Sequence, residues 1–154
     1  MSPFDLSRVI PAGFCIDDAV EDGETVVIVV RALSASGLCS VCGSPSATVH
    51  SRYERKLNDL PIGGRCARLV AQVRRFRWGF ASCPRRIFAE RFDGIAPPMA
   101  RRTRRLDEIV FCLAIALGGR PAAVLAKRIG SRSATTLCFG SCDAGNRRRC
   151  PLHR

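Results

Sequence analysis

The sequence lacks the segments that carry a chain into or across a membrane. Its longest apolar run, residues 109–119, is about half the length that a membrane span needs. The N-terminus has no basic stretch followed by an apolar one, as a secretion signal would have. No internal repeat is evident. We therefore expect a cytoplasmic protein without a membrane partner.

Acidic residues are scarce and unevenly placed. The chain has 13 Asp and Glu against 25 Lys and Arg, a net charge of +12. Residues 1–30 contain six acids and one base, a net of −5, so the remaining residues must carry +17. This separation favours a basic face that binds an acidic polymer, nucleic acid before a membrane surface. An arginine-rich composition bias is the plainer alternative.

Nine cysteines are an odd number, and without a leader they argue against a disulfide framework. Cys39 and Cys42 have the spacing with which two thiolates share one tetrahedral Zn²⁺, and Cys83 fits a third ligand. Three candidates remain for the fourth ligand: His50, Cys66 or water. The alternative is that these cysteines are small buried hydrophobic side chains.

The first part of the chain has strand periodicity. Segments 14–20 and 25–33 predict two strands joined by an acidic turn, and the second is rich in β-branched residues. A turn region is expected over 59–64. Alternating apolar residues predict a long strand over 66–78, and a shorter strand is expected over 86–90.

The periodicity becomes helical after residues 96–98, where two prolines predict a linker. Gly118 and Gly119 are expected to end the first helix. Its apolar stripe is formed by Leu106, Ile109, Val110, Leu113 and Leu117.

A second helix should begin near Pro121 and end at Gly130, and Ser131 or Ser133 would cap a third. The small Ala126 lets two helices approach, and a glycine four residues later permits the turn of a helix-turn-helix. The third helix would then enter the major groove of DNA. An ordinary three-helix bundle with solvated arginines is the alternative.

Basic residues beside these elements are the candidate DNA contacts. Those ahead of the first helix can lie along phosphates, and those at the start of the third helix can meet phosphates at a helix N-terminus. The expected DNA-binding residues are Arg74, Arg75, Arg85, Arg86, Arg101, Arg102, Arg104, Arg105, Arg132 and Ser133.

A series of short motifs resembles one known family, the N-terminal region of the ISL-three insertion-sequence transposases. The motifs are Cys39-x-x-Cys42-Gly43, His50-Ser51-Arg52-Tyr53, Leu60-Pro61, Arg74-Arg75-Phe76, the string 83–90 and the string 101–106. The resemblance runs from about residue 14 to about residue 137. In that family a zinc finger and a helix-turn-helix precede a catalytic domain whose acidic triad binds divalent metal.

The resemblance implies that Cys39, Cys42 and Cys83 are zinc ligands. The family's third cysteine falls on Trp78, which implies weakened zinc binding. No catalytic domain is expected in the remaining 24 residues after Gly130. Residues 137–150 have no helical period, and a one-base frameshift near Leu137 would explain them and their three cysteines.

The expected fold class is α+β in three segments. Residues 1–95 form a small β-rich zinc-finger-like domain, 96–137 a truncated helix-turn-helix, and 138–154 an aberrant, disordered tail. The expected function is recognition of transposon ends on double-stranded DNA by a transposase fragment that is not an enzyme. The expected protein partnership is a homodimer or an association with full-length transposase. The alternatives are a stand-alone DNA-binding regulator and a pseudogene remnant without function.

Overall fold

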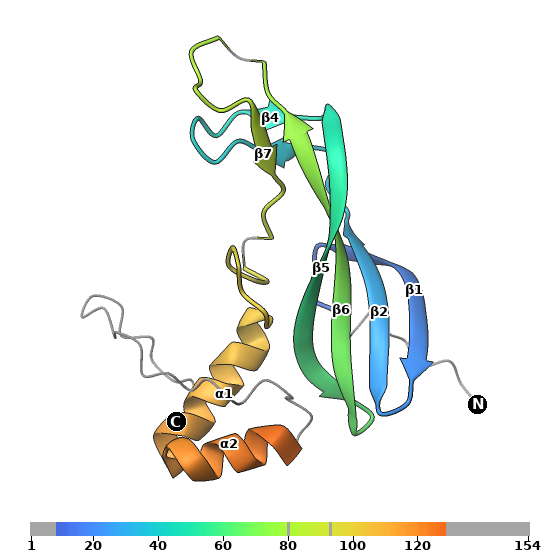
Figure 1. Cartoon of the computed structure of the whole chain (residues 1–154), viewed down its shortest axis with the longest axis vertical. Coiled ribbons are helices and arrows are strands. Elements are labelled where there is room, and N and C mark those ends of the chain that lie inside the picture. The colour runs from blue at the N-terminus through green and yellow to red at the C-terminus, as the bar shows by residue number, and fades with distance from the viewer. Residues whose placement is uncertain (1–8, 80, 93, 129–154) are drawn as a thin grey trace.

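A computed structural model describes residues 9–79, 81–92 and 94–128 (Figure 1). The larger sheet has the order β1-β2-β6-β5, with β7 also paired to β6, and a second sheet consists of β3 and β4. The strands are β1 (Phe14–Asp22), β2 (Thr25–Ala32), β3 (Gly37–Leu38), β4 (Pro45–Ser46), β5 (Val49–Ile62), β6 (Arg65–Arg77) and β7 (Ile87–Ala89). The helices are α1 (Arg104–Leu117) and α2 (Gly119–Arg128). The described residues are thus β-rich with two helices.

The four predicted strands are all present. β1 and β2 form the expected antiparallel hairpin, which turns at Gly23 with a φ of 57°. β6 is the expected long strand, and it pairs in parallel with β2, a feature that the sequence did not reveal. β7 pairs antiparallel with the last residues of β6.

β5 was not predicted, and the expected turn over 59–64 is wrong for its first four residues. Residues 59–62 belong to β5, and the turn is Gly63-Gly64 alone, with φ values of 57° and 78°. Two consecutive positive φ values are what a two-residue hairpin requires. The strand escaped detection because residues 52–56 carry four charged side chains, so half of β5 shows no apolar alternation.

The main core lies on one face of the larger sheet. Ile28, Leu57 and Leu69 are fully buried there on adjacent strands. Phe14 and Phe92 cover them with rings in edge-to-face contact at 4.9 Å. Alternation along β2 and β6 therefore directs one set of side chains into this core, as period-two burial requires.

α1 begins after Thr103, whose side chain accepts a hydrogen bond from the backbone of Leu106. It ends at Gly118, as predicted, with a φ of 77°. Leu106 and Val110 are buried against Ala126 of α2, whereas much of the predicted stripe is exposed. Ser131, the expected third helix and the proposed frameshift lie outside the described residues. Neither described helix is long and apolar enough to cross a membrane.

A buried carboxylate joins the helices to the sheet. One oxygen of Asp59 on β5 accepts hydrogen bonds from Thr103 Oγ1 (2.7 Å) and Arg105 Nε (2.8 Å), and the other accepts from Arg105 Nη2. The backbones of Asn58 and Thr103 are also bonded, at 3.0 Å. Arg55 of β5 also donates to the carbonyl oxygens of Pro97 and Ala100, so the segment predicted as a linker is bonded to β5. A domain boundary at residue 96 stays a prediction.

Replacing Asp59 by Asn should unfold this junction. The change removes one partner of a buried ion pair and leaves Arg105 without its carboxylate, which costs about 3 kcal/mol. Denaturant unfolding of the two chains would measure the loss. The matched control is Asp17→Asn, which removes an exposed partner of Arg31 and should change stability little. Equal stability of wild type and Asp59→Asn would contradict a structural role for this ion pair.

Candidate metal centre

Three cysteine thiols from two loops meet at the end of β6. Cys39 and Cys42 lie on the turn between β3 and β4, and Cys83 lies on the loop between β6 and β7. Their sulfur atoms all lie within 4.8 Å of one another, and those of Cys39 and Cys83 are 3.9 Å apart. The turn is closed by a backbone bond from Gly43 to Cys39 of 2.9 Å, with Gly43 at a φ of 72°. The predicted ligand set is therefore assembled.

The small sheet is held against the larger one by close packing. Gly37 of β3 lies over the ring of Phe76, where an added Cβ would come within 2.5 Å of a ring carbon. Ser46 of β4 donates a hydrogen bond to the carbonyl oxygen of Arg77, at 2.8 Å. Phe76 and Phe88 form a buried cluster with two of the cysteines. These contacts position the first two thiols beside the third.

The three thiols differ in exposure and acidity. Cys39 and Cys83 are buried, and Cys42 is exposed. A hydrogen bond from the backbone N–H of Ser44 lowers the pKa of Cys42 to about 7. The N–H of Arg85 acts in the same direction on Cys83, but burial and the neighbouring thiols outweigh it and raise that pKa. Cys42 is therefore a readier thiolate than Cys83 at neutral pH, and Cys83 must lose a more firmly held proton to bind metal.

The cluster is compatible with zinc. Because zinc–sulfur bonds measure about 2.3 Å, two sulfurs on one tetrahedral ion lie about 3.8 Å apart. The distance between Cys39 and Cys83 fits this geometry. Cys39, Cys42 and Cys83 would hold zinc through thiolates, and the ion would cross-link the two loops.

Neither predicted alternative for a fourth protein ligand joins the cluster. Cys66 pairs with Thr25 at the far end of β6, roughly 33 Å of strand away from Phe76. His50 is exposed on β5, with its Nδ1 3.3 Å from the hydroxyl of Ser51. Among the residues that the structure describes, no other His, Cys, Asp or Glu completes the group.

Trp78 lies beside the thiols, next to the end of β6. Its side chain packs against the cluster that contains Cys39 and Cys83, and its ring meets Phe88 edge to face at 6.3 Å. Its backbone N–H donates to the carbonyl oxygen of Arg86, at 2.7 Å, which fixes Trp78 against the loop that carries the third thiol. A large indole therefore borders the site where the family resemblance expects a sulfur.

Several of the predicted DNA-binding arginines have carboxylate partners. Arg74 donates to Glu90 through Nε at 3.0 Å, and Arg102 lies 3.1 Å from Asp107. Arg105 is held by Asp59 as described above. Their predicted role in DNA binding stays a prediction, but their guanidinium groups are already positioned within the fold.

The other predicted contacts are more accessible. Arg75 is exposed, with its guanidinium carbon 5.0 Å from the centre of the Tyr53 ring. The remaining exposed members of the predicted set are Arg85, Arg86, Arg101 and Arg104. Arg132 and Ser133 lie outside the described residues.

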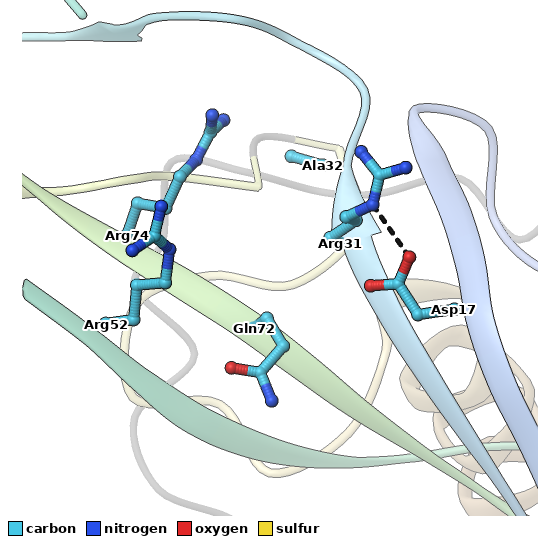
Figure 2. Close-up of a pocket in the computed structure, with 6 residues that line it drawn as sticks. All are labelled: Asp17, Arg31, Ala32, Arg52, Gln72 and Arg74. Atoms are coloured by element: carbon cyan, nitrogen blue, oxygen red, sulfur yellow. Dashed lines mark hydrogen bonds and ion pairs between the residues drawn. The ribbon is translucent and has the colours of Figure 1, made fainter. Parts of the chain in front are cut away.

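Sequence reasoning missed two further arginines. Figure 2 shows Arg31 and Arg52 with Arg74 and Gln72 around a shallow depression on the larger sheet. Arg31 is paired with Asp17 at 2.7 Å. Arg52 lies directly across from Arg74 in the register between β5 and β6. The register of β6 with both β2 and β5 brings these residues together, and the sequence revealed neither the parallel pairing nor β5.

One protein-family model matches the segment that carries the first two thiols. Residues 35–77 match the family described as the zinc-finger of transposase IS204/IS1001/IS1096/IS1165. This segment, called the ribbon below, is similar to the zinc ribbon of that transposase family, and together with the thiol cluster it supports the resemblance drawn from the motifs over these residues. The match includes Cys39 and Cys42 and ends just before Trp78, so it does not extend to Cys83. No curated protein and no solved structure matches the chain.

Replacing Trp78 by Cys should strengthen zinc binding by about tenfold or more, because the new side chain would add a fourth thiolate to the three that are already assembled. Competition with a chromogenic chelator would measure the affinity of each chain. Trp78→Phe is the control that removes the indole without adding sulfur. Identical affinities for wild type and Trp78→Cys would mean that position 78 does not face the metal.

Gly37→Ala should loosen the ribbon, because the new methyl group would collide with the ring of Phe76. We expect a lower thermal midpoint and weaker zinc binding, since the thiols of the turn would move away from Cys83. Gly79→Ala is the matched control, because nothing lies within 4 Å of a Cβ there. A Gly37→Ala chain with unchanged stability and zinc affinity would contradict the packing.

Thiol reactivity should reveal the lowered pKa of Cys42. In the metal-free chain, we expect iodoacetamide to modify Cys42 first among the three thiols, with a rate that rises through about pH 7. Zinc affinity should fall as the pH drops through the same range, because protons then compete for this sulfur. Peptide mapping by mass spectrometry would identify the modified site. Earlier modification of Cys39 or Cys83 would contradict the assignment.

Proposed function

We propose that this chain binds duplex DNA as the recognition part of an insertion-sequence transposase and engages the ends of the transposon. The observation that carries the proposal is the ISL3-type zinc ribbon at residues 35–77, completed by a thiol cluster at a basic end of the sheet. Binding alone is proposed, and cleavage and strand transfer are not assigned to this chain. A homodimer or a complex with full-length transposase stays a prediction.

Exposed arginines beside the ribbon support this proposal. Arg75 and Arg77 lie at the end of β6 and pair with residues of β7. Arg85 and Arg86 precede β7, and the bond from Trp78 to Arg86 brings this loop back to β6. All four arginine side chains are exposed. Such a group suits phosphate contacts, which give affinity and register rather than sequence information.

The edge strand β1 limits where DNA can approach. Asp18, Glu21 and Asp22 are exposed on this strand, which is separated from β5 by β2 and β6. A duplex would be repelled by this acidic edge and attracted by the basic end of β6. We therefore infer that the duplex lies across the ribbon end of the sheet.

We infer that the helices form the second contact, as a helix-turn-helix spanning residues 96–137. α1 and α2 pack through Leu106, Val110 and Ala126, which supports a compact helix pair. Arg101 and Arg104 are exposed at the start of α1. The proposed recognition helix lies outside the described residues.

DNA binding should depend on the exposed arginines beside the ribbon. Replacing Arg75, Arg85 and Arg86 by Ala should weaken binding to any duplex and flatten the dependence of log K on log salt by about 0.9 for each phosphate that is no longer neutralised. Fluorescence anisotropy at several salt concentrations, with a terminal inverted repeat and a scrambled duplex, would measure both effects.

The control for this experiment is Arg65→Ala, at the opposite end of β6, where Arg65 is paired with Glu21. This variant should bind DNA with nearly the wild-type salt dependence. A double variant of Arg101 and Arg104 tests the helix contact separately. The proposal would be contradicted if the triple variant and the Arg65 variant had the same affinity and salt slope.

A further inference from the structure

The metal cluster has a three-sulfur donor set. The described residues bring together Cys39, Cys42 and Cys83, while Trp78 packs against the buried cluster that contains Cys39 and Cys83. Cys42 is exposed, so a reagent can reach the thiols from its side. Among the residues that the structure describes, a tetrahedral zinc ion would find three of its four preferred ligands.

We propose that this cluster is a three-thiolate site that favours a thiophilic centre whose coordination is complete with three sulfur ligands, such as trivalent arsenic, over tetrahedral zinc. Soft thiolate ligands favour soft centres, so selectivity among such centres is decided by ligand number and geometry. Three sulfurs within 4.8 Å of one another can converge on one pyramidal centre. Such a centre needs no fourth protein ligand, so the presence of Trp78 in place of a cysteine does not weaken its binding.

The binding step with arsenite is an exchange of ligands. Each of the three thiol sulfurs replaces one hydroxyl group of arsenous acid. An arsenic–oxygen bond breaks, an arsenic–sulfur bond forms, and the thiol proton leaves with the hydroxyl group as water. Three water molecules are released in all. Arsenic remains trivalent, so no oxidant or reductant takes part.

The test uses the full, reduced, metal-free chain with arsenite alone, with Zn²⁺ alone, and with both together. Native mass spectrometry should detect one arsenic for each chain, with the mass of arsenous acid less three waters. In the mixture, arsenic should occupy the site in preference to zinc. The readout contains no DNA, so failure here would leave the proposed DNA-binding function untouched.

Variants at the three ligands identify the site. Cys42→Ser changes the exposed thiol and should abolish the complex that has released three waters. The matched control replaces Cys138, Cys142 and Cys150 together by Ser and should leave arsenite binding unchanged. If arsenite binding survives Cys42→Ser with the same mass, or is abolished in the control, the site is elsewhere and the proposal is overturned.

Variants at position 78 test the selectivity. Trp78→Cys should raise zinc affinity by about tenfold and leave arsenite affinity unchanged, so that the preference for arsenic falls. Trp78→Phe, which adds no sulfur, should keep the wild-type preference. The proposal is overturned if zinc displaces arsenite from the wild-type chain at equal concentration, or if Trp78→Cys strengthens arsenite binding as much as zinc binding.

Discussion

The arrangement of sheet and helices depends on the buried carboxylate of Asp59. A charge in a protein interior is costly unless it is paired and hydrogen-bonded, and Asp59 has both Arg105 and Thr103 as donors. Thr103 is also the N-cap of α1, so its side chain both donates to Asp59 and caps the first turn of the helix. One carboxylate therefore determines where α1 begins and which strand it contacts. The basic start of the helix is thereby held against β5.

β6 is the strand on which the rest of the sheet is built. It pairs with β5 along one edge and with β2 and then β7 along the other. Its last residues place Phe76 under the ribbon and lead to the loop that carries Cys83. The metal cluster, the basic group of arginines and the apolar core thus all depend on the position of this single strand.

The sequence predicts four of the described strands and misses the long strand β5, whose first half has a run of charged residues. β2 was predicted from its β-branched residues, β1 from the acidic turn that joins it to β2, and β6 from apolar alternation, whereas the end of α1 was predicted from Gly118. The three thiols were found because metal ligands have a characteristic spacing. β5 begins with Val49 but carries its other aliphatic residues, Leu57, Leu60 and Ile62, in its second half.

Interactions between distant residues escaped prediction for a different reason. The pairing of Asp59 with Arg105 joins residues 46 positions apart, and neither residue type indicates its partner. The same holds for the parallel register of β2 and β6 and for the depression around Arg52. Cys66 was a candidate fourth ligand because its distance from the cluster along β6 cannot be inferred from the positions of the cysteines in the sequence.

The parallel pairing of β2 with β6 has a consequence for the order of folding. The hairpins β1–β2 and β5–β6 each join neighbouring segments through short turns, whereas their mutual pairing must close the loop that contains the whole thiol turn. Closure of such a loop costs chain entropy before favourable interactions form, so it is the slow event in building the sheet. A metal that joins Cys39 and Cys42 to Cys83 ties that loop to the strand that it must reach. The ion would then affect the folding kinetics, because it would hold the two hairpins in register once they have paired.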